Sequence, residues 1–442
     1  MSDLLTIGAS GVKAYGRALS VVGDNIANAQ TDGYVRRTVR LEEAPVAGDA
    51  ALSRNSIRAS GVSAAGVTRE LDQYLVDDAR TASGEAARQS ARLNWISATE
   101  STLGNGGNDI GATVTEIFAA ADQLSANPND ATLRRQFLNN VDESASAFRR
   151  TSVALGSAAN GVAMEARGAV DQLNTDLSAL SQVNGGLRRA RAGSTNEANL
   201  FDERNRLIGN IATAIDIDVG YDANNAAIIR TPAGDPLVDG DSIAIVTLGV
   251  SAGGLLSFGI HPVTLLAPAS GRLAGLADSA AHISTQRTTL DSLAEQLSIT
   301  LNTAHQAGVD ANASAGKPLL DFKDSAADLT ATALAIADVA TANAAGSNGN
   351  ILAFNTIRVS SGIEQGISAF IAQQAQITFA VRAQEAAASG RRDGAFAARD
   401  AVGAVDLDRE AADLLRFQQA YEAAARTIQV ARETMQTMLN IF

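Results

Sequence analysis

The sequence predicts a mainly α-helical protein with a small inserted β domain, because long helical periodicities flank one short, turn-rich region of alternating sequence. We expect the N- and C-terminal helices to pair as a coiled-coil stalk, a bundle of long helices to come next and the β domain to lie outermost. Hydrophobic residues make up 46% of the 442 residues and aromatic residues only 4%, a balance typical of thin helical bundles. The predicted domains are a terminal coiled coil (1–35 and 404–442), a helical bundle with short strands (36–215 and 269–403) and the β insert (216–268).

The C-terminal stretch carries the clearest helical pattern. Six large apolar residues recur there at intervals of seven: Leu407, Leu414, Tyr421, Ile428, Met435 and Phe442. The companion position three residues further on is mostly apolar after the first turn and includes Phe417. A seven-residue apolar repeat makes a narrow stripe on a helix, and such a stripe requires a partner helix.

The N-terminal stretch, residues 2–29, repeats the pattern at Leu5, Val12, Leu19 and Ile26. Four glycines interrupt this predicted helix, and each costs an isolated helix about 1 kcal/mol relative to alanine. Glycines also allow two helices to approach closely. We therefore expect the N-terminal helix to pair with the C-terminal helix of the same chain.

Between the two ends, short strands or an extended hairpin are expected over 36–67, where polar and apolar residues alternate loosely. Helical periodicity then predicts separate helices over 69–103, 110–124, 133–155, 162–187, 199–215, 271–306 and 366–388. Residues 390–403 either continue the last of these helices or kink it. Alternation and closely spaced turn signals predict strands over 216–268, and β-like runs are expected over 331–359.

The sequence offers no catalytic or metal-binding pattern. It contains no cysteine, its three histidines have no metal-ligand spacing, and the glycine-rich loop at 104–108 lacks the phosphate-binding spacing. Asp216, Asp218 and Asp222 alternate but lack the glycine and distal glutamate of a calcium loop. We expect no enzymatic activity, no catalytic or metal-ligating residues and no cofactor.

The overall charge and hydropathy exclude further classes of partner. A net charge of −13 disfavours binding to nucleic acid or to an anionic membrane surface. No stretch approaches the roughly 20 apolar residues of a membrane span, and no cleavable signal peptide is recognisable at the N-terminus. We expect neither nucleic acid nor membrane as a partner.

Residues 25–34, Asn-Ile-Ala-Asn-Ala-Gln-Thr-Asp-Gly-Tyr, end the N-terminal helix. Asparagine favours helix ends and turns, and Gly33 can adopt a positive φ at no steric cost. Together with the paired repeats, this stretch resembles the flagellar axial proteins, the family of rod, hook and hook-associated subunits. The matching residues include Asn25, Ile26, Asn28, Thr31, Gly33 and Tyr34.

The C-terminus resembles the same family. The stretches Val-Asp-Leu-Asp-Arg-Glu at 405–410 and Phe-Gln-Gln-Ala-Tyr at 417–421 match its pattern, as does Leu439 in the Leu-Asn-Ile ending. The resemblance covers about 80 residues at the two ends. Long helices inside the termini resemble the hook-associated subunits of the hook–filament junction more than hook or rod proteins, whose middle regions are largely β.

The resemblance implies a structural subunit of the bacterial flagellum, assembled at the hook tip as the first ring of the hook–filament junction and adapting the flexible hook to the filament. Its implied partners are copies of itself in the ring, the hook protein below, a second junction protein and the filament above, and an export chaperone. It implies an extracellular location, reached from the cytoplasm through the flagellar type III export system. The expected interface residues are those of the two repeats and the two terminal motifs, from Leu5 to Tyr34 and from Leu407 to Phe442.

Three alternatives stay open from the sequence. A hook or distal-rod subunit shares the terminal patterns but has a β-dominated middle region. A hydrolase acting on the cell wall requires a carboxylate or histidine cluster in a cleft. A free-standing coiled-coil adaptor requires termini that are ordered in the isolated protein.

Overall fold

The computed structural model describes residues 2–31, 33–45, 59–104, 109–261 and 264–440. The chain divides into two compact units, each assembled from segments far apart in sequence. Unit 1 comprises Met1–Gly84, Gln172–Ile245 and Ser389–Phe442, and unit 2 comprises Glu85–Asp171 and Val246–Ala388.

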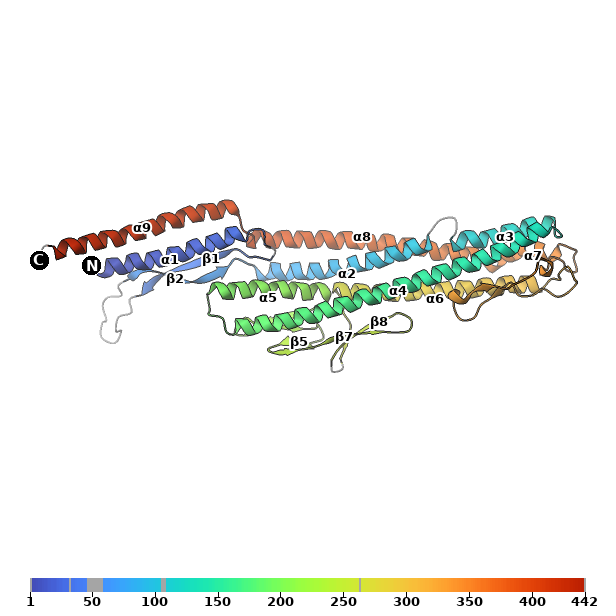
Figure 1. Ribbon diagram of the computed structural model, residues 1–442, viewed down its shortest axis with the longest axis horizontal. Coiled ribbons are helices and arrows are strands. Elements are labelled where there is room, and N and C mark those ends of the chain that lie inside the picture. Colours follow the sequence, from blue (N-terminus) through green and yellow to red (C-terminus); the bar gives the residue numbers. More distant parts are fainter. Residues whose placement is uncertain (1, 32, 46–58, 105–108, 262–263, 441–442) are drawn as a thin grey trace. The chain divides into compact units, whose positions relative to one another are not determined.

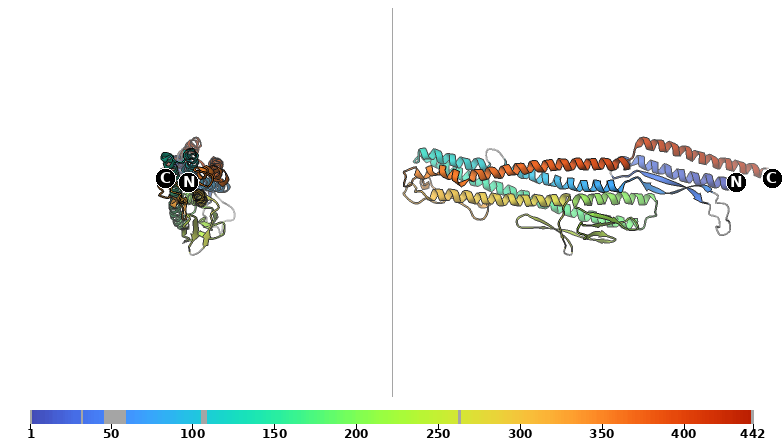
Figure 2. Two further views of the ribbon diagram at one scale, coloured as in Figure 1. Left: turned by 90° about the vertical axis from the view of Figure 1, so that its right-hand side faces the viewer. Right: turned by 180° about the vertical axis from the view of Figure 1, so that it is seen from behind.

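Unit 1 contains both terminal helices. Helix α1 (Ser2–Ala27) packs on α9 (Leu407–Leu439) and also contacts a hairpin of β1 (Arg37–Pro45) and β2 (Ala59–Arg69), so it lies between them (Figures 1 and 2). The helices run antiparallel, because Gly8 faces Ile428 and Gly16 faces Tyr421. The predicted pairing of the two ends of the chain is confirmed.

Glycine makes this helix contact possible. A Cβ atom at Gly8 would lie 2.7 Å from Cγ1 of Ile428, and one at Gly11 would lie 2.9 Å from Cβ of Ala424. Both distances are shorter than real Cβ contacts allow, so the two backbones approach as closely as only glycine permits. The residues that weaken α1 as an isolated helix are therefore those that fit it to α9.

The β1–β2 hairpin confirms the strands expected over 36–67, although its connection at 46–58 lies outside the described residues. Strand β2 approaches α1 closely at Gly61, whose φ is +107°. The backbone N–H of the next residue, Val62, donates to Oγ of Ser10 in α1 at 3.2 Å. A side chain at Gly61 would collide with Ser10. The absence of a side chain at Gly61 therefore allows the hairpin to pack closely on α1, as Gly8 and Gly11 allow α9 to do.

The rest of unit 1 consists of α5 (Thr195–Ala214), parts of α2 (Gln73–Leu103), α4 (Ala131–Leu187) and α8 (Ile363–Gly403), and a four-stranded antiparallel sheet. The strands of this sheet lie in the order β3 (Asp218–Tyr221), β4 (Ala227–Arg230), β5 (Pro236–Asp239) and β6 (Ser242–Ile243). Asn184 of α4 exchanges two 2.8 Å hydrogen bonds with the backbone of Ala227. These two bonds fix the sheet against α4.

Unit 2 contains a large, contiguous apolar core. Its helices are α3 (Ile110–Ala126), α6 (Gly271–Gln306), α7 (Gly349–Ser361) and the remaining parts of α2, α4 and α8. Phe137 and Phe354 meet edge to face in the core, with ring centroids 5.7 Å apart. The smaller elements are β7 (Val246–Val250), β8 (Leu256–Ile260), β9 (Thr264–Leu266), β10 (Leu320–Asp321), β11 (Thr330–Ala331) and short 3₁₀ turns at Ala326–Asp328 and Ile336–Asp338.

Several predicted boundaries are wrong. The helices expected over 133–155 and 162–187 are one continuous helix, α4, and the ring of Trp95 packs on it at Gly161, between the two predicted segments. Part of the β-like region expected over 331–359 is helix α7. For residues 390–403 the sequence left continuation or a kink open, and α8 continues through them.

The residues of the predicted β insert form two separate sheets. Strands β3–β6 belong to unit 1 and strands β7–β9 to unit 2. The predicted fold class, mainly helical with a small sheet-rich region, is confirmed, and the predicted division into three domains stays a prediction.

Candidate functional site

The stretch 25–34 ends α1 in a compact turn. The Thr31 amide donates to the Asn28 carbonyl at 2.9 Å, and the Tyr34 amide donates to the Thr31 carbonyl at 3.1 Å. The side-chain amide of Asn28 is bonded back to the Asp24 carbonyl at 2.9 Å. Gly33 has a φ of +79°, the left-handed conformation that its position in the turn requires.

Asn25 lies at the centre of a buried group of polar side chains, here called the polar junction. Its side-chain amide donates to the Arg37 carbonyl at 2.8 Å and to Oε2 of Glu410 at 2.9 Å. Its side-chain oxygen accepts from the Arg37 amide at 3.1 Å and from the Tyr34 hydroxyl at 2.9 Å. The polar junction comprises Asn25, Tyr34, Arg36, Arg37, Arg69, Glu70, Asp202, Glu410 and Asp413.

Arg36 connects the hairpin to α9. Its Nε lies 2.6 Å from Oε1 of Glu410 and its Nη2 lies 3.1 Å from Asp413. Its Nη1 contacts Glu70 at 2.5 Å. Burial by itself lowers the pKa of Arg36, but the hydrogen bonds with Glu70 and Glu410 raise it above its ordinary value. The Glu410 side chain is completely shielded from solvent, so its charge is balanced inside the protein.

Arg37 and Arg69 connect the hairpin to α5. Both guanidinium groups pair with Asp202, and Arg37 also donates to Oδ1 of Asn199 at 2.8 Å. The Arg37 guanidinium lies over the Tyr34 ring, 4.7 Å from its centroid. Burial raises the pKa of Tyr34 to about 12, so its hydroxyl keeps the proton that it donates to Asn25.

The polar junction joins four distant segments of unit 1: the end of α1, the hairpin, α5 and the start of α9. Buried ion pairs add little net stability, because desolvation offsets their attraction, but leaving one buried charge without its partner is costly. The site therefore positions the paired terminal helices on the rest of unit 1. No group of three or more potential ligand side chains in the described parts of the chain is arranged to hold a metal ion.

The structure brings together some of the predicted site residues at the polar junction and places others along the terminal helices. Asn25 and Tyr34 belong to the junction, and Asn28, Thr31 and Gly33 form the turn beside it. Leu5, Val12, Leu19, Leu414, Phe417 and Ile428 are half-buried along the helix pair. Ile26, Leu407, Tyr421 and Met435 are exposed. The side chain of Leu439 and the whole of Phe442 lie outside the described residues.

Sequence reasoning missed the charged members of the polar junction: Arg36, Arg37, Arg69, Glu70, Asp202, Glu410 and Asp413. One signal was present, because Glu410 occupies a companion position of the C-terminal repeat that is otherwise mostly apolar. A carboxylate at such a position requires a buried partner. The adjacent pair Arg36 and Arg37, directly after the turn, supplies the cations.

The fold and the site define a class of protein in which the two terminal helices pair with each other and are joined by buried polar contacts to the segments next to them in unit 1. Three family models match, and two of them describe flagellar rod proteins at the two ends. The model "Flagella basal body rod protein" matches residues 5–34, and "Flagellar basal body rod FlgEFG protein C-terminal" matches 404–441. These two matches place the chain among the flagellar axial proteins.

The third model, "Flagellar hook-associated protein FlgK helical domain", matches residues 96–320, which is half of the chain. The chain belongs to the FlgK family of flagellar hook-associated proteins.

Relatives of known identity carry the name flagellar hook-associated protein 1. The protein from Bacillus subtilis strain 168 is 25% identical, and the match covers 96% of this chain and 95% of that protein. The protein from Escherichia coli K12 is also 25% identical, over 72% of this chain and 59% of its own length. The chain thus spans somewhat more than half of the E. coli relative and nearly all of the B. subtilis one.

A solved structure supports the fold. The flagellar hook junction protein FlgK from Burkholderia pseudomallei matches with a TM-score of 0.51 at 18% sequence identity. The match covers 55% of this chain and 46% of that protein. Within the described residues, no helix is both long and apolar enough to cross a membrane.

Proposed function

We propose that this protein is a structural subunit of the bacterial flagellum and assembles at the hook tip as the first ring of the hook–filament junction. The observation that carries the proposal is the pairing of α1 with α9 inside a chain of the FlgK family. The relatives' names describe hook-associated proteins, and the solved neighbour is titled a hook junction protein. The ring adapts the hook to the filament.

The terminal helices supply the surface for assembly. Pairing with α1 leaves Leu407, Tyr421 and Met435 of α9 exposed, and Ile26 is exposed on α1. Large apolar side chains on one helix pair favour docking against further copies, since covering each fully is worth roughly 1.5–3 kcal/mol. The predicted interface residues that remain accessible are therefore the ones proposed to contact neighbouring subunits.

The proposed partners are copies of the chain in the ring, the hook protein below, and a second junction protein and the filament above. An export chaperone binds the subunit before assembly, and the flagellar type III system exports it from the cytoplasm to its extracellular position. A role of this kind needs no catalytic group, and the polar junction provides contacts that position segments rather than groups that react. We infer that the protein is not an enzyme.

The test is immunogold labelling of isolated hook–filament complexes with an antibody raised against residues 216–268. A single short band of label at the distal end of the hook is the expected result. Label along the whole hook would instead identify a hook subunit, and label below the hook a rod subunit. Absence of label from every flagellar part would refute the structural role.

A further inference from the structure

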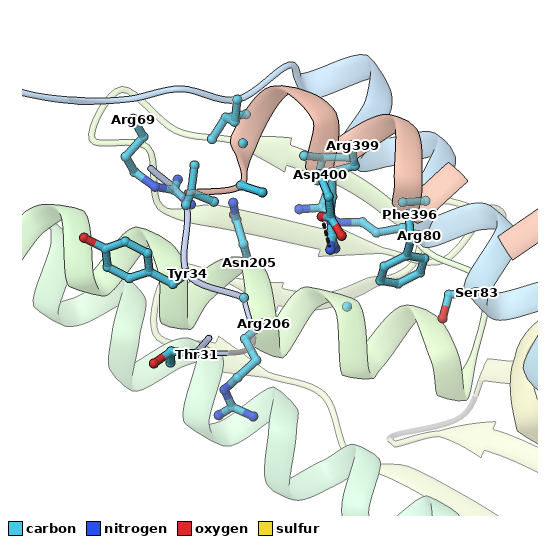
Figure 3. A pocket seen from close by; sticks show the side chains of 18 of the residues that line it. Thr31, Tyr34, Arg69, Arg80, Ser83, Asn205, Arg206, Phe396, Arg399 and Asp400 are labelled. Atoms are coloured by element: carbon cyan, nitrogen blue, oxygen red, sulfur yellow. Dashed lines mark hydrogen bonds and ion pairs between the residues drawn. The ribbon is translucent and has the colours of Figure 1, made fainter. Parts of the chain in front are cut away.

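Beside the polar junction, unit 1 contains a cavity of about 450 Å³ (Figure 3). It lies among the turn that follows α1, the start of α2, the middle of α5 and the end of α8. Apolar side chains line part of its wall, among them Leu71, Val76 and Phe396. Arginines line another part, among them Arg69 and Arg80. Its volume is in the range of small-molecule sites, roughly 300–1,000 Å³.

The wall of this cavity carries buried positive charge that the described residues do not balance. The side chains of Arg69 and Arg80 are only 7% and 9% exposed, and Arg204 behind them is 6% exposed. Arg69 shares the single carboxylate of Asp202 with Arg37. Within the part of the chain that the structure describes, Arg80 pairs with Asp77 alone, a largely exposed residue.

Arg204 has no carboxylate partner among the described residues. It donates to the Asn225 carbonyl, and its Nε and Nη2 lie 3.2 Å and 3.0 Å from Oδ1 of Asn205. Its guanidinium also lies over the Tyr221 ring at 4.4 Å. Burial lowers the pKa of Arg204 to about 10, and the nearby charges of Arg69 and Arg80 add to that lowering. The guanidinium stays charged at neutral pH.

Two guanidinium nitrogens have unused donors. Nε of Arg69 and Nη2 of Arg80 are shielded from solvent and donate to no atom of the described chain. A buried cation without its full set of partners is costly, so such a group favours binding of an anion. Two further arginines of the cavity wall add no unbalanced positive charge, because Arg206 pairs with Glu203 and Arg399 pairs with Asp400.

We propose that this cavity binds a small organic carboxylate. The carboxylate group lies against Arg80, which lies beside Phe396 in the cavity wall (Figure 3) and whose planar guanidinium favours paired hydrogen bonds to an oxyanion. The apolar part of the ligand lies against Leu71, Val76 and Phe396. Such a carboxylate belongs either to a free organic acid or to an acidic side chain of a second copy of the chain.

Asn205 provides the sharpest test, because it lines the cavity and contacts Arg204. Asn205→Asp changes the shape of the side chain hardly at all, but it gives Arg204 a carboxylate partner and places a negative charge in the cavity wall, where it repels a bound carboxylate. We expect this variant to unfold at a higher temperature than the native protein and to bind the probe at least tenfold more weakly. A merely destabilising substitution would not produce both effects together.

The binding experiment is calorimetric titration of the full-length protein with 3-phenylpropionate, with acetate and inorganic phosphate as comparison probes. We expect 3-phenylpropionate to bind about tenfold more tightly than acetate, because only its ring covers the apolar wall. Arg80→Gln lowers the affinity about tenfold and Arg80→Lys restores part of it. Arg230→Gln, an exposed arginine of unit 1 outside the cavity, is the control and leaves the affinity unchanged.

Binding that is equal in the native protein and Asn205→Asp, or no binding at all, would overturn the proposal. Phosphate binding more tightly than both carboxylates would overturn the assigned ligand class. Analytical sedimentation of the native protein with and without 3-phenylpropionate distinguishes the two sources of the natural carboxylate, a free organic acid and an acidic side chain of a second copy. Loss of self-association in its presence identifies a side chain of another copy as the natural occupant, and unchanged self-association identifies a free acid.

Discussion

At Asn25 a single side-chain amide determines how the first helix meets the rest of unit 1. Both of its donor hydrogens and its acceptor oxygen are used, by the hairpin, the turn and α9. An aspartate of the same shape would lose both donors and place a second negative charge beside Glu410. The asparagine at this position of the terminal motif is therefore explained by its hydrogen bonds and not only by its preference for turns.

Loss of the Glu410 carboxylate should release the terminal helices. Glu410→Ala leaves the buried Arg36 with fewer partners and costs unit 1 about 3–5 kcal/mol, the usual range for breaking a buried ion pair. Hydrogen exchange of amides in α1 and α9, followed by mass spectrometry, measures the effect. Glu422→Ala, an exposed position on α9, is the matched control and should change exchange little. Equal exchange in the two variants would contradict the role given to the junction.

His305 predicts a pH dependence for unit 2. The ring is buried, with Nδ1 2.6 Å from the Lys317 carbonyl and Nε2 accepting from the Ala340 amide at 2.9 Å, so only the neutral ring satisfies both contacts. Burial lowers the pKa of His305 below its ordinary value near 6.5. The unfolded chain therefore binds more protons between the two pKa values, and stability falls as pH drops below about 6.5.

Urea unfolding of the native protein and of His305→Gln at pH 7.5 and 5.0 measures this contribution. The loss of stability between the two pH values should be smaller in His305→Gln, because its amide does not titrate. His261→Gln, at an exposed position, should keep the full pH dependence. The opposite ranking of the two variants would contradict the assignment.

At the scale of elements, the glycines of α1 have opposite roles that depend on the face they occupy. Gly11→Leu places a side chain where Ala424 already lies and should separate α1 from α9, with a loss of several kcal/mol. Gly23 has open space around it, so Gly23→Ala should stabilise the helix by roughly 0.5–1 kcal/mol. Circular dichroism during thermal unfolding compares the two. A stabilising Gly11→Leu would show that the helices do not approach as described.

The long helix α4 allows the same comparison in unit 2. Gly161→Val would place Cβ 2.3 Å from Cη2 of Trp95, whose Nε1 donates to Glu165 of the same helix at 2.8 Å. Displacement of the indole should shift its fluorescence to longer wavelength and lower the unfolding temperature by several degrees. Trp95 is the only tryptophan, so the signal is specific. Gly168→Ala, in open space on α4, should leave the fluorescence unchanged.

The sequence predicted elements with long, uninterrupted patterns better than their ends. The seven-residue repeats identified α1 and α9 as partners, and the period of 271–306 matched α6 at both ends. The sequence separated 133–155 from 162–187 because the apolar pattern changes there, but one helix, α4, runs through both, and Trp95 packs on it at Gly161. Most of the polar junction was missed for a related reason: Asp202 and Arg69 are ordinary charged residues until the fold brings them together.

At the scale of the whole molecule, two substitutions on α9 distinguish the pairing of α1 with α9 inside one chain from the assembly of several chains. Ile428 contacts Gly8 of α1, so Ile428→Asp should destabilise the helix pair in the isolated protein and abolish motility. Met435 is 50% exposed, so Met435→Asp should leave the isolated protein as stable as the native one and impair assembly alone. Thermal unfolding and swimming assays measure the two effects. Normal motility of both variants would contradict the proposed assembly surface.

The antiparallel pairing of α1 with α9 also determines how unit 1 responds to force. The first residues of α1 and the last residues of α9 lie at one end of the helix pair, and the polar junction lies at the other (Figure 1). Pulling the two termini apart loads one turn of the pair at a time, so the helices peel from their free end. Pulling the free end of α9 away from the junction loads every contact at once in shear. The pair therefore resists tension along its axis and yields to separation at its tip.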